Sequence, residues 1–166
     1  WTSLMEIGCG AGANLVNIVK GTKEKQVGGV DINPEAIKVC GEVLNGAFLR
    51  VGSILDIPMS DNSADVLLTD MMLIYVSPSK VDTALRELKR VARRQVVFCE
   101  LHSLSFWRRL QIRFVEGLYV HNFKKLLERQ GFYDIEIIKI KPEHWPESDL
   151  QQKYAFIIKA TVPKRK

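Results

Sequence analysis

The sequence predicts an α/β fold, a three-layer sandwich in which helices cover both faces of a doubly wound sheet. Apolar segments of strand length alternate with amphipathic segments of helix length along most of the chain, a pattern typical of parallel sheets with helical crossovers. Near the end, residues 132–141 and 153–162 are both strand-like, and too few residues separate them for a helical crossover. The last two strands are therefore expected to pair antiparallel.

The first strand and the turn after it organise the rest of the chain. Apolar residues surround Glu6, and Gly8, Gly10 and Gly12 follow at alternate positions before helix-like sequence at 14–19. Glycine allows a sharp turn and lets a ligand lie against bare main chain. The start of a helix adds unpaired N–H groups and a partial positive charge. This combination predicts a ligand-binding turn.

Glu6 is the one charged residue in this apolar strand. A buried carboxylate is costly unless it meets a cation or a hydrogen-bond donor. One interpretation is a core carboxylate bonded to nearby backbone, and the other is a group directed at a ligand amine. We favour the second, because a charge beside a glycine turn is typical of a binding site.

Asp31 ends the next predicted strand, residues 26–31. It lies about twenty residues beyond the glycine turn, a spacing at which a carboxylate binds a ribose diol in nucleotide-binding units. The alternative is a helix cap, since Pro34 marks a helix start, but Asn33 is better placed as that cap. Further strands are expected at 47–51, 66–70 and 95–100, and helices at 34–44, 79–92 and 119–130. The basic residues of the second of these helices are expected on its solvated side; they are Arg86, Lys89, Arg90, Arg93 and Arg94.

Composition limits the broad class. A chain of 166 residues is expected to form one domain, and 46% apolar with 26% charged residues is ordinary for a soluble globular protein. No apolar run reaches the roughly 18 residues of a membrane span, so no membrane insertion is expected. Cys9, Cys40 and Cys99 have no metal-ligand spacing, which predicts no metal site, reduced thiols and a cytoplasmic location.

The ordered set of motifs resembles the class I S-adenosylmethionine (SAM)-dependent methyltransferases. The resemblance begins with Glu6-x-Gly8-x-Gly10-x-Gly12, continues through Val30-Asp31-Ile32-Asn33-Pro34 and covers nearly the whole chain. It implies a Rossmann-like fold with seven strands in the order 3-2-1-4-5-7-6, strand 7 being antiparallel, and SAM as the cofactor. Family members usually carry helical sequence before the first strand, so residues 1–166 are expected to lack it and to be a fragment or a trimmed chain.

The same resemblance implies the cofactor-binding residues. Asp31 would hold the ribose, Ile32 would pack on the adenine, and Asp70 would flank the methionine part. Ser53 stands where relatives commonly carry an aspartate that bonds the adenine amino group, a departure that leaves Ser53 or Asp56 as the acceptor. The full set is Glu6, Gly8, Cys9, Gly10, Gly12, Asp31, Ile32, Ser53, Ile54 and Asp70.

Two residues are candidates for catalysis. Tyr75 falls where relatives often carry a histidine near the transferred methyl group, although packing in the cavity wall is an equal alternative. His102 follows the fifth predicted strand and could accept a proton near neutral pH, whereas the alternative is a structural histidine.

Residues 104–118 combine aromatic and basic side chains: Phe106, Trp107, Arg108, Arg109, Arg113 and Phe114. A helix or lid near the mouth of the site is expected here. We favour aromatic side chains packed on the core with hydrated arginines. The alternative is a cationic rim for an acidic acceptor.

The predicted function is methyl transfer from SAM to an acceptor, with a small molecule expected. A nucleic acid is less expected, because Asp70-Met71-Met72-Leu73 replaces the Asn/Asp-Pro-Pro-Tyr/Phe signature of resembling enzymes that methylate its amino groups. One alternative is a catalytically silent SAM-binding partner subunit. Another is an NAD-type dehydrogenase, since Gly8-x-Gly10-x-x-Ala13 fits the relaxed dinucleotide pattern, but Glu6 and the closing hairpin disfavour it.

Overall fold

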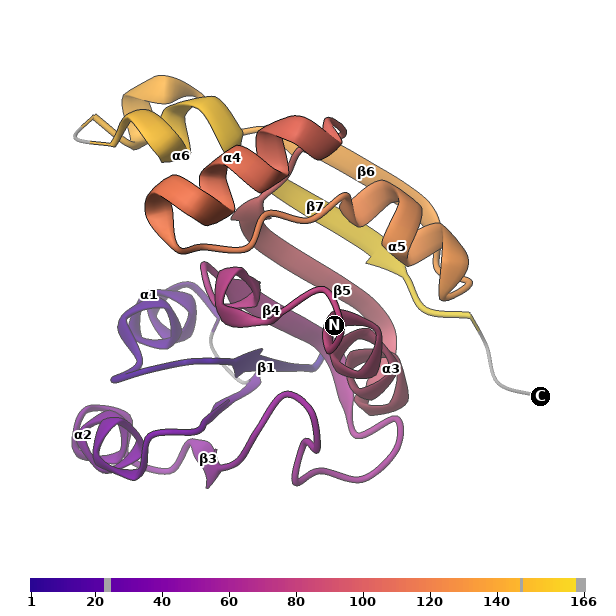
Figure 1. Ribbon diagram of the computed structural model, residues 1–166. Helices are drawn as coiled ribbons and strands as arrows, with labels where there is room; N and C mark the ends of the chain where they lie inside the picture. The colour runs from indigo at the N-terminus through magenta and orange to yellow at the C-terminus, as the bar shows by residue number, and fades with distance from the viewer. Residues whose placement is uncertain (23–24, 147, 164–166) are drawn as a thin grey trace.

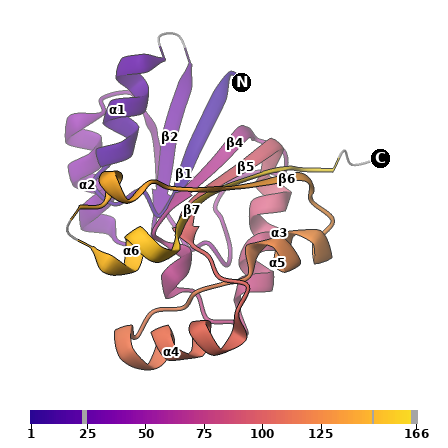
Figure 2. The same ribbon diagram turned by 90° about the horizontal axis from the view of Figure 1, so that it is seen from above.

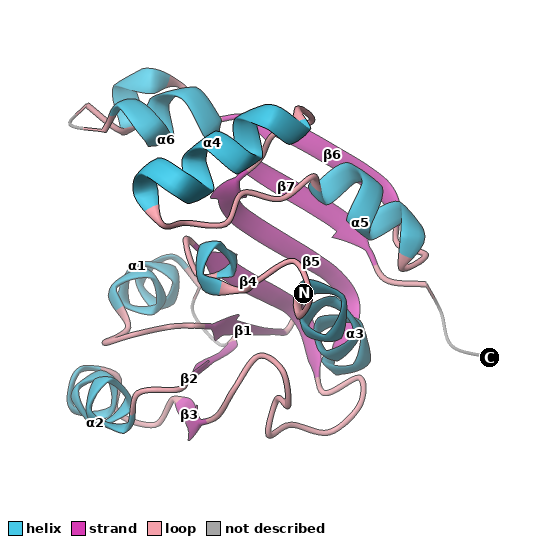
Figure 3. Ribbon diagram, viewed as in Figure 1, coloured by secondary structure: helices cyan, strands magenta, loops and turns pink. Residues whose placement is uncertain are grey.

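The protein is built on a seven-stranded sheet with strand order β3-β2-β1-β4-β5-β7-β6. The computed structural model describes residues 1–22, 25–146 and 148–163. Strand β7 runs antiparallel to β5 and β6, and all the other neighbours are parallel (Figures 1 and 3). The fold class, strand order and reversed last strand predicted above are confirmed. The strands are β1 (Ser3–Ile7), β2 (Gln26–Asp31), β3 (Phe48–Val51), β4 (Ala64–Asp70), β5 (Ala92–Leu101), β6 (Tyr133–Lys139) and β7 (Ala155–Thr161).

Helices form the two outer layers. In Figure 2, α1 and α2 lie on one side of the sheet, and α3 and α5 lie on the other. The helices are α1 (Ala13–Gly21), α2 (Pro34–Val43), α3 (Val81–Val91), α4 (Phe106–Glu116), α5 (Phe123–Arg129) and α6 (Asp149–Tyr154), with 3-10 turns η1 (Leu73–Tyr75) and η2 (Pro142–His144).

The core lies mainly between the sheet and the α3–α5 layer. One face of α3 is apolar and buried, so burial of that stripe fixes this helix against β4 and β5. Phe98 of β5 and Phe123 of α5 are fully buried, with ring centroids 5.6 Å apart. This core holds the carboxyl ends of β1, β4 and β5 in fixed register, which is the edge where ligands bind in open α/β sheets.

Local signals set the ends of two helices. The Asn33 side chain accepts a hydrogen bond from the Glu35 N–H at 3.0 Å, so Asn33 caps α2 as predicted. Asn122 caps α5 in the same way, accepting from the Lys125 N–H at 3.2 Å. Helix α5 therefore starts at Phe123, and the expectation of a helix from residue 119 is wrong.

The connection between the last two strands is more structured than predicted. It contains η2 and α6, and residues 153 and 154 belong to α6 rather than to the last strand. Leu150 and Tyr154 of α6 pack against a small cluster around Ile74 and Leu101, which stabilises this short helix. Within the described residues, no helix has both the length and the apolar character needed to cross a bilayer.

Candidate functional site

The glycine turn after β1 combines close packing with an open surface. Gly8, Gly10 and Gly12 have φ values of 82°, 52° and 88°, which disfavour any side chain. A Cβ on Gly8 would lie 2.3 Å from Met72 Cγ, and one on Gly12 would lie 2.5 Å from Cys40 Sγ. A Cβ on Gly10 would meet no atom within 4 Å. The outer glycines therefore allow tight packing, and Gly10 leaves bare backbone accessible to a ligand.

Two carboxylates meet beside this turn. The Asn14 side-chain amide donates to Glu6 Oε1 at 2.8 Å and to Asp70 Oδ2 at 2.9 Å. The second oxygens, Glu6 Oε2 and Asp70 Oδ1, are buried and have no hydrogen-bond partner among the described residues. Burial raises the pKa of Glu6 to about 7; the Asn14 hydrogen bond opposes this shift, and the charges of Asp70 and Asp31 add to it. This pair provides a negative, incompletely satisfied pocket suited to a cation.

Asp31 supports the turn while keeping the capacity to bind a ligand. Its Oδ2 accepts from the Gly10 N–H at 2.8 Å, and its Oδ1 accepts from the Asn33 N–H at 2.8 Å. Each carboxylate oxygen can accept a second hydrogen bond. Asp31 therefore fixes the turn and can still accept from two hydroxyl groups.

A cavity of about 410 Å³ opens along the carboxyl ends of the strands, within the usual range for small-ligand sites. The structure brings together most of the predicted site residues here, including exposed Ile32 and Tyr75. The lining residues are Ile7, Gly8, Asp31, Ile32, Gly52, Ser53, Ile54, Asp70, Met71, Met72, Tyr75 and Val76.

Five predicted residues lie outside the cavity lining: Glu6, Cys9, Gly10, Gly12 and His102. Cys9 is buried under the turn with its Sγ 3.6 Å from the Gly10 carbonyl oxygen, and burial raises the pKa of its thiol to about 12. His102 is buried, its Nδ1 accepts from the Phe123 N–H at 3.2 Å, and burial lowers its pKa. The His102 ring packs edge-on against the Phe156 ring, with the ring centroids 5.3 Å apart. Cys9 therefore acts as a packing group in this structure, and His102 as an anchor for α5.

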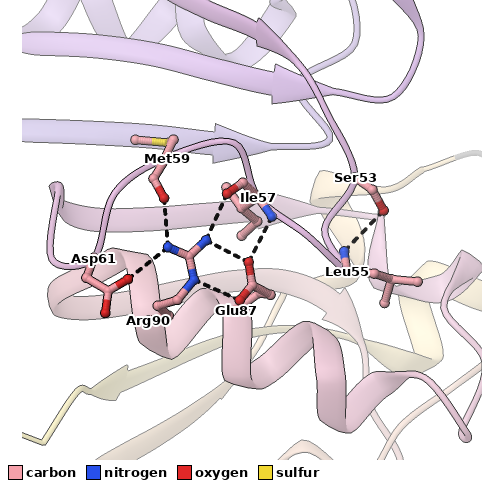
Figure 4. A network of polar contacts seen from close by, with 7 residues as sticks. All are labelled: Ser53, Leu55, Ile57, Met59, Asp61, Glu87 and Arg90. Carbon is pink, nitrogen blue, oxygen red and sulfur yellow. Dashed lines mark hydrogen bonds and ion pairs between the residues drawn. The ribbon is translucent and has the colours of Figure 1, made fainter.

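A polar network anchors the loop that carries Ser53 and Ile54 (Figure 4). The Ser53 hydroxyl accepts from the Leu55 N–H at 3.1 Å, so this side chain also orders its own loop. The loop is held to α3 by Arg90, which donates to the Glu87 and Asp61 carboxylates and to the Ile57 and Met59 carbonyls.

Arg90 therefore does not belong to the solvated side of α3, and that expectation is wrong. Hydrogen bonds from Arg90 lower the pKa of Glu87, which also accepts from the Ile57 N–H at 2.9 Å. The Arg90–Glu87 pair therefore holds the loop between β3 and β4 against α3.

Sequence reasoning assigned no role to two residues that shape the site, although it placed Glu100 at the ligand-binding edge of the sheet. Asn14 joins Glu6 to Asp70, and its position in the first turn of the helix after the glycines was the available signal. Glu100 is fully buried, and its Oε1 accepts from the N–H groups of Met72 at 3.0 Å and Leu73 at 2.9 Å. Burial raises the pKa of Glu100 to about 7, against the effect of these two donors. Glu100 thus positions the loop that forms one wall of the cavity.

Comparison with known proteins agrees with this geometry. Residues 5–99 match the methyltransferase domain family. The chain belongs to that family. The matched segment begins within β1 and ends within β5, so it includes the glycine turn and the loops after β2, β3 and β4.

Several known methyltransferases are similar to this methyltransferase domain. An uncharacterized methyltransferase of Schizosaccharomyces pombe is 31% identical over 101 residues, which cover 54% of this chain and 36% of that protein. This domain thus spans about a third of that relative's length. Geranyl diphosphate C-methyltransferase from Streptomyces coelicolor, in complex with S-adenosyl-L-homocysteine (SAH), has a TM-score of 0.76 at 16% identity, covering 98% of this chain and 70% of that one.

A further neighbour is the putative methyltransferase in complex with the Trm112 methyltransferase activator of Haloferax volcanii. It has a TM-score of 0.74 at 16% identity, covering 98% of this chain and 84% of that one. At such low identity these structural matches concern the fold alone.

Proposed function

We propose that this methyltransferase domain binds SAM in the 410 Å³ cavity and transfers its methyl group to an acceptor at the cavity mouth. The supporting observation is the pair of buried, unpartnered oxygens on Glu6 and Asp70, which Asn14 joins and of which Asp70 lines the cavity. SAM carries an α-ammonium and a sulfonium group, so it supplies positive charge to an acidic pocket. The similar Streptomyces coelicolor enzyme is described with SAH bound.

Strand order supports a single orientation of the cofactor. The order β3-β2-β1-β4 places the Ser53–Ile54 loop, Asp31, the glycine turn and Asp70 consecutively along one edge. In this orientation the adenine lies by Ile32 and Ile54, the ribose diol donates to Asp31, and the ammonium meets Glu6 and Asp70. The methyl group then points toward Tyr75.

The proposed chemistry needs little from the protein beyond alignment. The carbon–sulfur bond breaks as a nucleophilic atom of the acceptor bonds the methyl carbon, and the sulfur keeps the electron pair as a neutral thioether. Such positioning contributes on the order of 7–11 kcal/mol to a two-reactant step. Tyr75 is exposed at the mouth, where its ring and hydroxyl can orient the acceptor. We propose a small-molecule acceptor because the cavity has the volume of a small-ligand site.

Calorimetric titration with SAH tests cofactor binding. Saturable binding is expected for the natural sequence, and Asp31→Ala should weaken it about tenfold or more through loss of the ribose contacts. Asp149→Ala is the matched control, because Asp149 lies on α6 and its side chain is 90% exposed. Absence of heat at millimolar SAH, or equal affinity in Asp31→Ala, would contradict the proposal.

Transfer itself is tested with SAM labelled in its methyl group and a panel of small-molecule acceptors. Label in an acceptor supports the enzymatic role, whereas binding with no transfer to any acceptor supports a silent partner subunit. Stronger binding of NAD than of SAM would support a dehydrogenase. A cytoplasmic location is part of the proposal and is supported by the three free cysteines.

A further inference from the structure

Helix α4 leaves its apolar stripe exposed, and two residues of the stripe, Phe106 and Leu110, border a groove between α4 and α5. Phe106, Leu110 and Phe114 recur every four residues and are 60%, 36% and 80% exposed; Trp107 beside them is 76% exposed. Ile112, on the opposite side, is the buried residue of this helix. The expectation that these aromatic side chains pack on the core is therefore wrong. An amphipathic helix with its apolar side outward needs another surface to cover it.

Three arginines flank this stripe. By helical geometry, Arg109 and Arg113 lie along one side of it, and Arg108 lies beyond the other. Arg108 donates to the Gln111 side-chain oxygen, Arg109 to the Ser103 and Leu104 carbonyls, and Arg113 to the Gly117 carbonyl. In the described part of the chain these guanidinium groups have only neutral acceptors and no ion pair. Their charge is available to an anionic surface.

The helix is capped at both ends and joined to the candidate site. The Ser105 side chain caps its start, accepting from the Arg108 N–H at 3.3 Å, and Gly117 ends it with a φ of 71°. Ile112 packs in one cluster with Ile74, and the Tyr119 N–H donates to the Ile74 carbonyl at 2.8 Å. Figure 2 shows α4 standing apart from the layers of the sheet and helices. It therefore projects next to the loop that carries Tyr75.

We propose that α4 docks this protein onto the surface of an anionic lipid bilayer. Aromatic residues on one side and arginines beside them are the features of helices that lie in the membrane interface. Tryptophan also prefers the headgroup level. The arginines beside the stripe form no ion pair among the described residues, so their charge matches anionic headgroups. Docking would bring the exposed Tyr75 and the mouth of the cavity close to the lipid surface.

Co-sedimentation with vesicles tests this proposal. The full chain is mixed with vesicles of phosphatidylcholine alone or with 30% phosphatidylglycerol, at low and at physiological salt. We expect binding to the anionic vesicles that weakens with added salt, because guanidinium attraction is screened. Trp107→Ser/Phe114→Ser should bind about tenfold or more weakly, since two interfacial aromatic side chains are lost. The double variant Val43→Ser/Ile138→Ser is the matched control, because both residues are exposed apolar side chains away from α4.

SAH titration of the same variants shows that they remain folded, and it separates this proposal from the proposed function. Unchanged SAH binding with lost vesicle binding supports docking through α4. Absence of binding to anionic vesicles, or equal binding by the α4 variant and the control, would overturn it. Concentration-dependent dimers that disappear in the α4 variant, without vesicle binding, would overturn it in favour of a second copy of the chain.

Discussion

The glycine turn and helix α4 both lie near the carboxyl edge of the sheet. Folded proteins usually bury apolar side chains and expose charged ones, and these two regions depart from that rule in opposite directions. At the turn, the carboxylates of Glu6 and Asp70 are withdrawn from water with one oxygen each unpartnered. On α4, Phe114 and Trp107 are left in water. A folded chain gains nothing from either arrangement by itself, because buried charge and exposed apolar surface both cost free energy.

The difference indicates what each region binds. The site beside the turn is concave and acidic, and hydrogen bonds hold Asp31 and Glu6 in place, which suits a small cation-bearing ligand held in one orientation. Helix α4 projects from the protein with an exposed apolar stripe and arginines beside it, which suits an extended surface without a fixed register. The glycine turn is therefore suited to selecting one small ligand, and α4 to attaching the protein to a surface.

The largest expected contrast is between Phe123 of α5 and Phe114 of α4, in the free energy of unfolding lost when each is replaced by alanine. Phe123→Ala removes a fully buried ring and should lower the free energy of unfolding by about 3–5 kcal/mol. Phe114→Ala removes an exposed ring and should change it by less than about 0.5 kcal/mol. Urea denaturation of both variants measures the contrast. A loss of stability in Phe114→Ala similar to that in Phe123→Ala would mean that the α4 stripe packs on the protein.

Two glycines with nearly the same φ, Gly8 and Gly46, give the next contrast. Gly8→Ala places a Cβ 2.3 Å from Met72 Cγ at a φ of 82°, so it should cost about 2–3 kcal/mol and abolish SAH binding. Gly46→Ala has a φ of 84° but no atom within 4 Å of the new Cβ, so about 1 kcal/mol is expected, with normal binding. Denaturation and SAH titration check both. Equal losses in the two variants would show that contact with Met72 is unimportant.

Glu6→Gln should affect binding more than folding. Removing this charge should weaken SAH affinity about tenfold without lowering stability, because the unliganded carboxylate is destabilised by its burial. The pKa of Glu6 is about 7, and a ligand ammonium would stabilise the ionised form. Binding should therefore release a proton near neutral pH, and affinity should fall as pH drops below 7.

Calorimetry in two buffers of different ionisation enthalpy measures that proton. The Glu6→Gln variant should release none, and Glu35→Gln, an exposed residue of α2, serves as the control. Affinity that is independent of pH between 5.5 and 8 (roughly two units around the shifted pKa) would contradict the role of Glu6.

The sequence contained enough information to predict the fold and much of the cavity. Strand periodicity, the spaced glycines, Asp31 and the short connection to the last strand are local features, and local features determine this topology. Seven of the predicted residues line the same cavity: Gly8, Asp31, Ile32, Ser53, Ile54, Asp70 and Tyr75.

The missed features depend on contacts between distant segments. The 3.6-residue period of α4 reveals an apolar stripe but not the side to which it faces; the burial of Ile112 in the cluster with Ile74 and Leu101 sets that direction. Likewise, the sequence pattern of α3 places Arg90 among the solvated residues. Its role depends on contact with the loop at 57–61, whose carbonyl groups accept its hydrogen bonds. Asn14 acquires its role only when β1 and β4 become neighbours.

A crystal structure of the protein with SAH would test the central claim most directly. We predict the amino group of SAH beside Glu6 and Asp70, its ribose hydroxyls on Asp31 and its adenine against Ile32. SAH bound elsewhere, with the cavity along the carboxyl ends of the strands empty, would contradict this account.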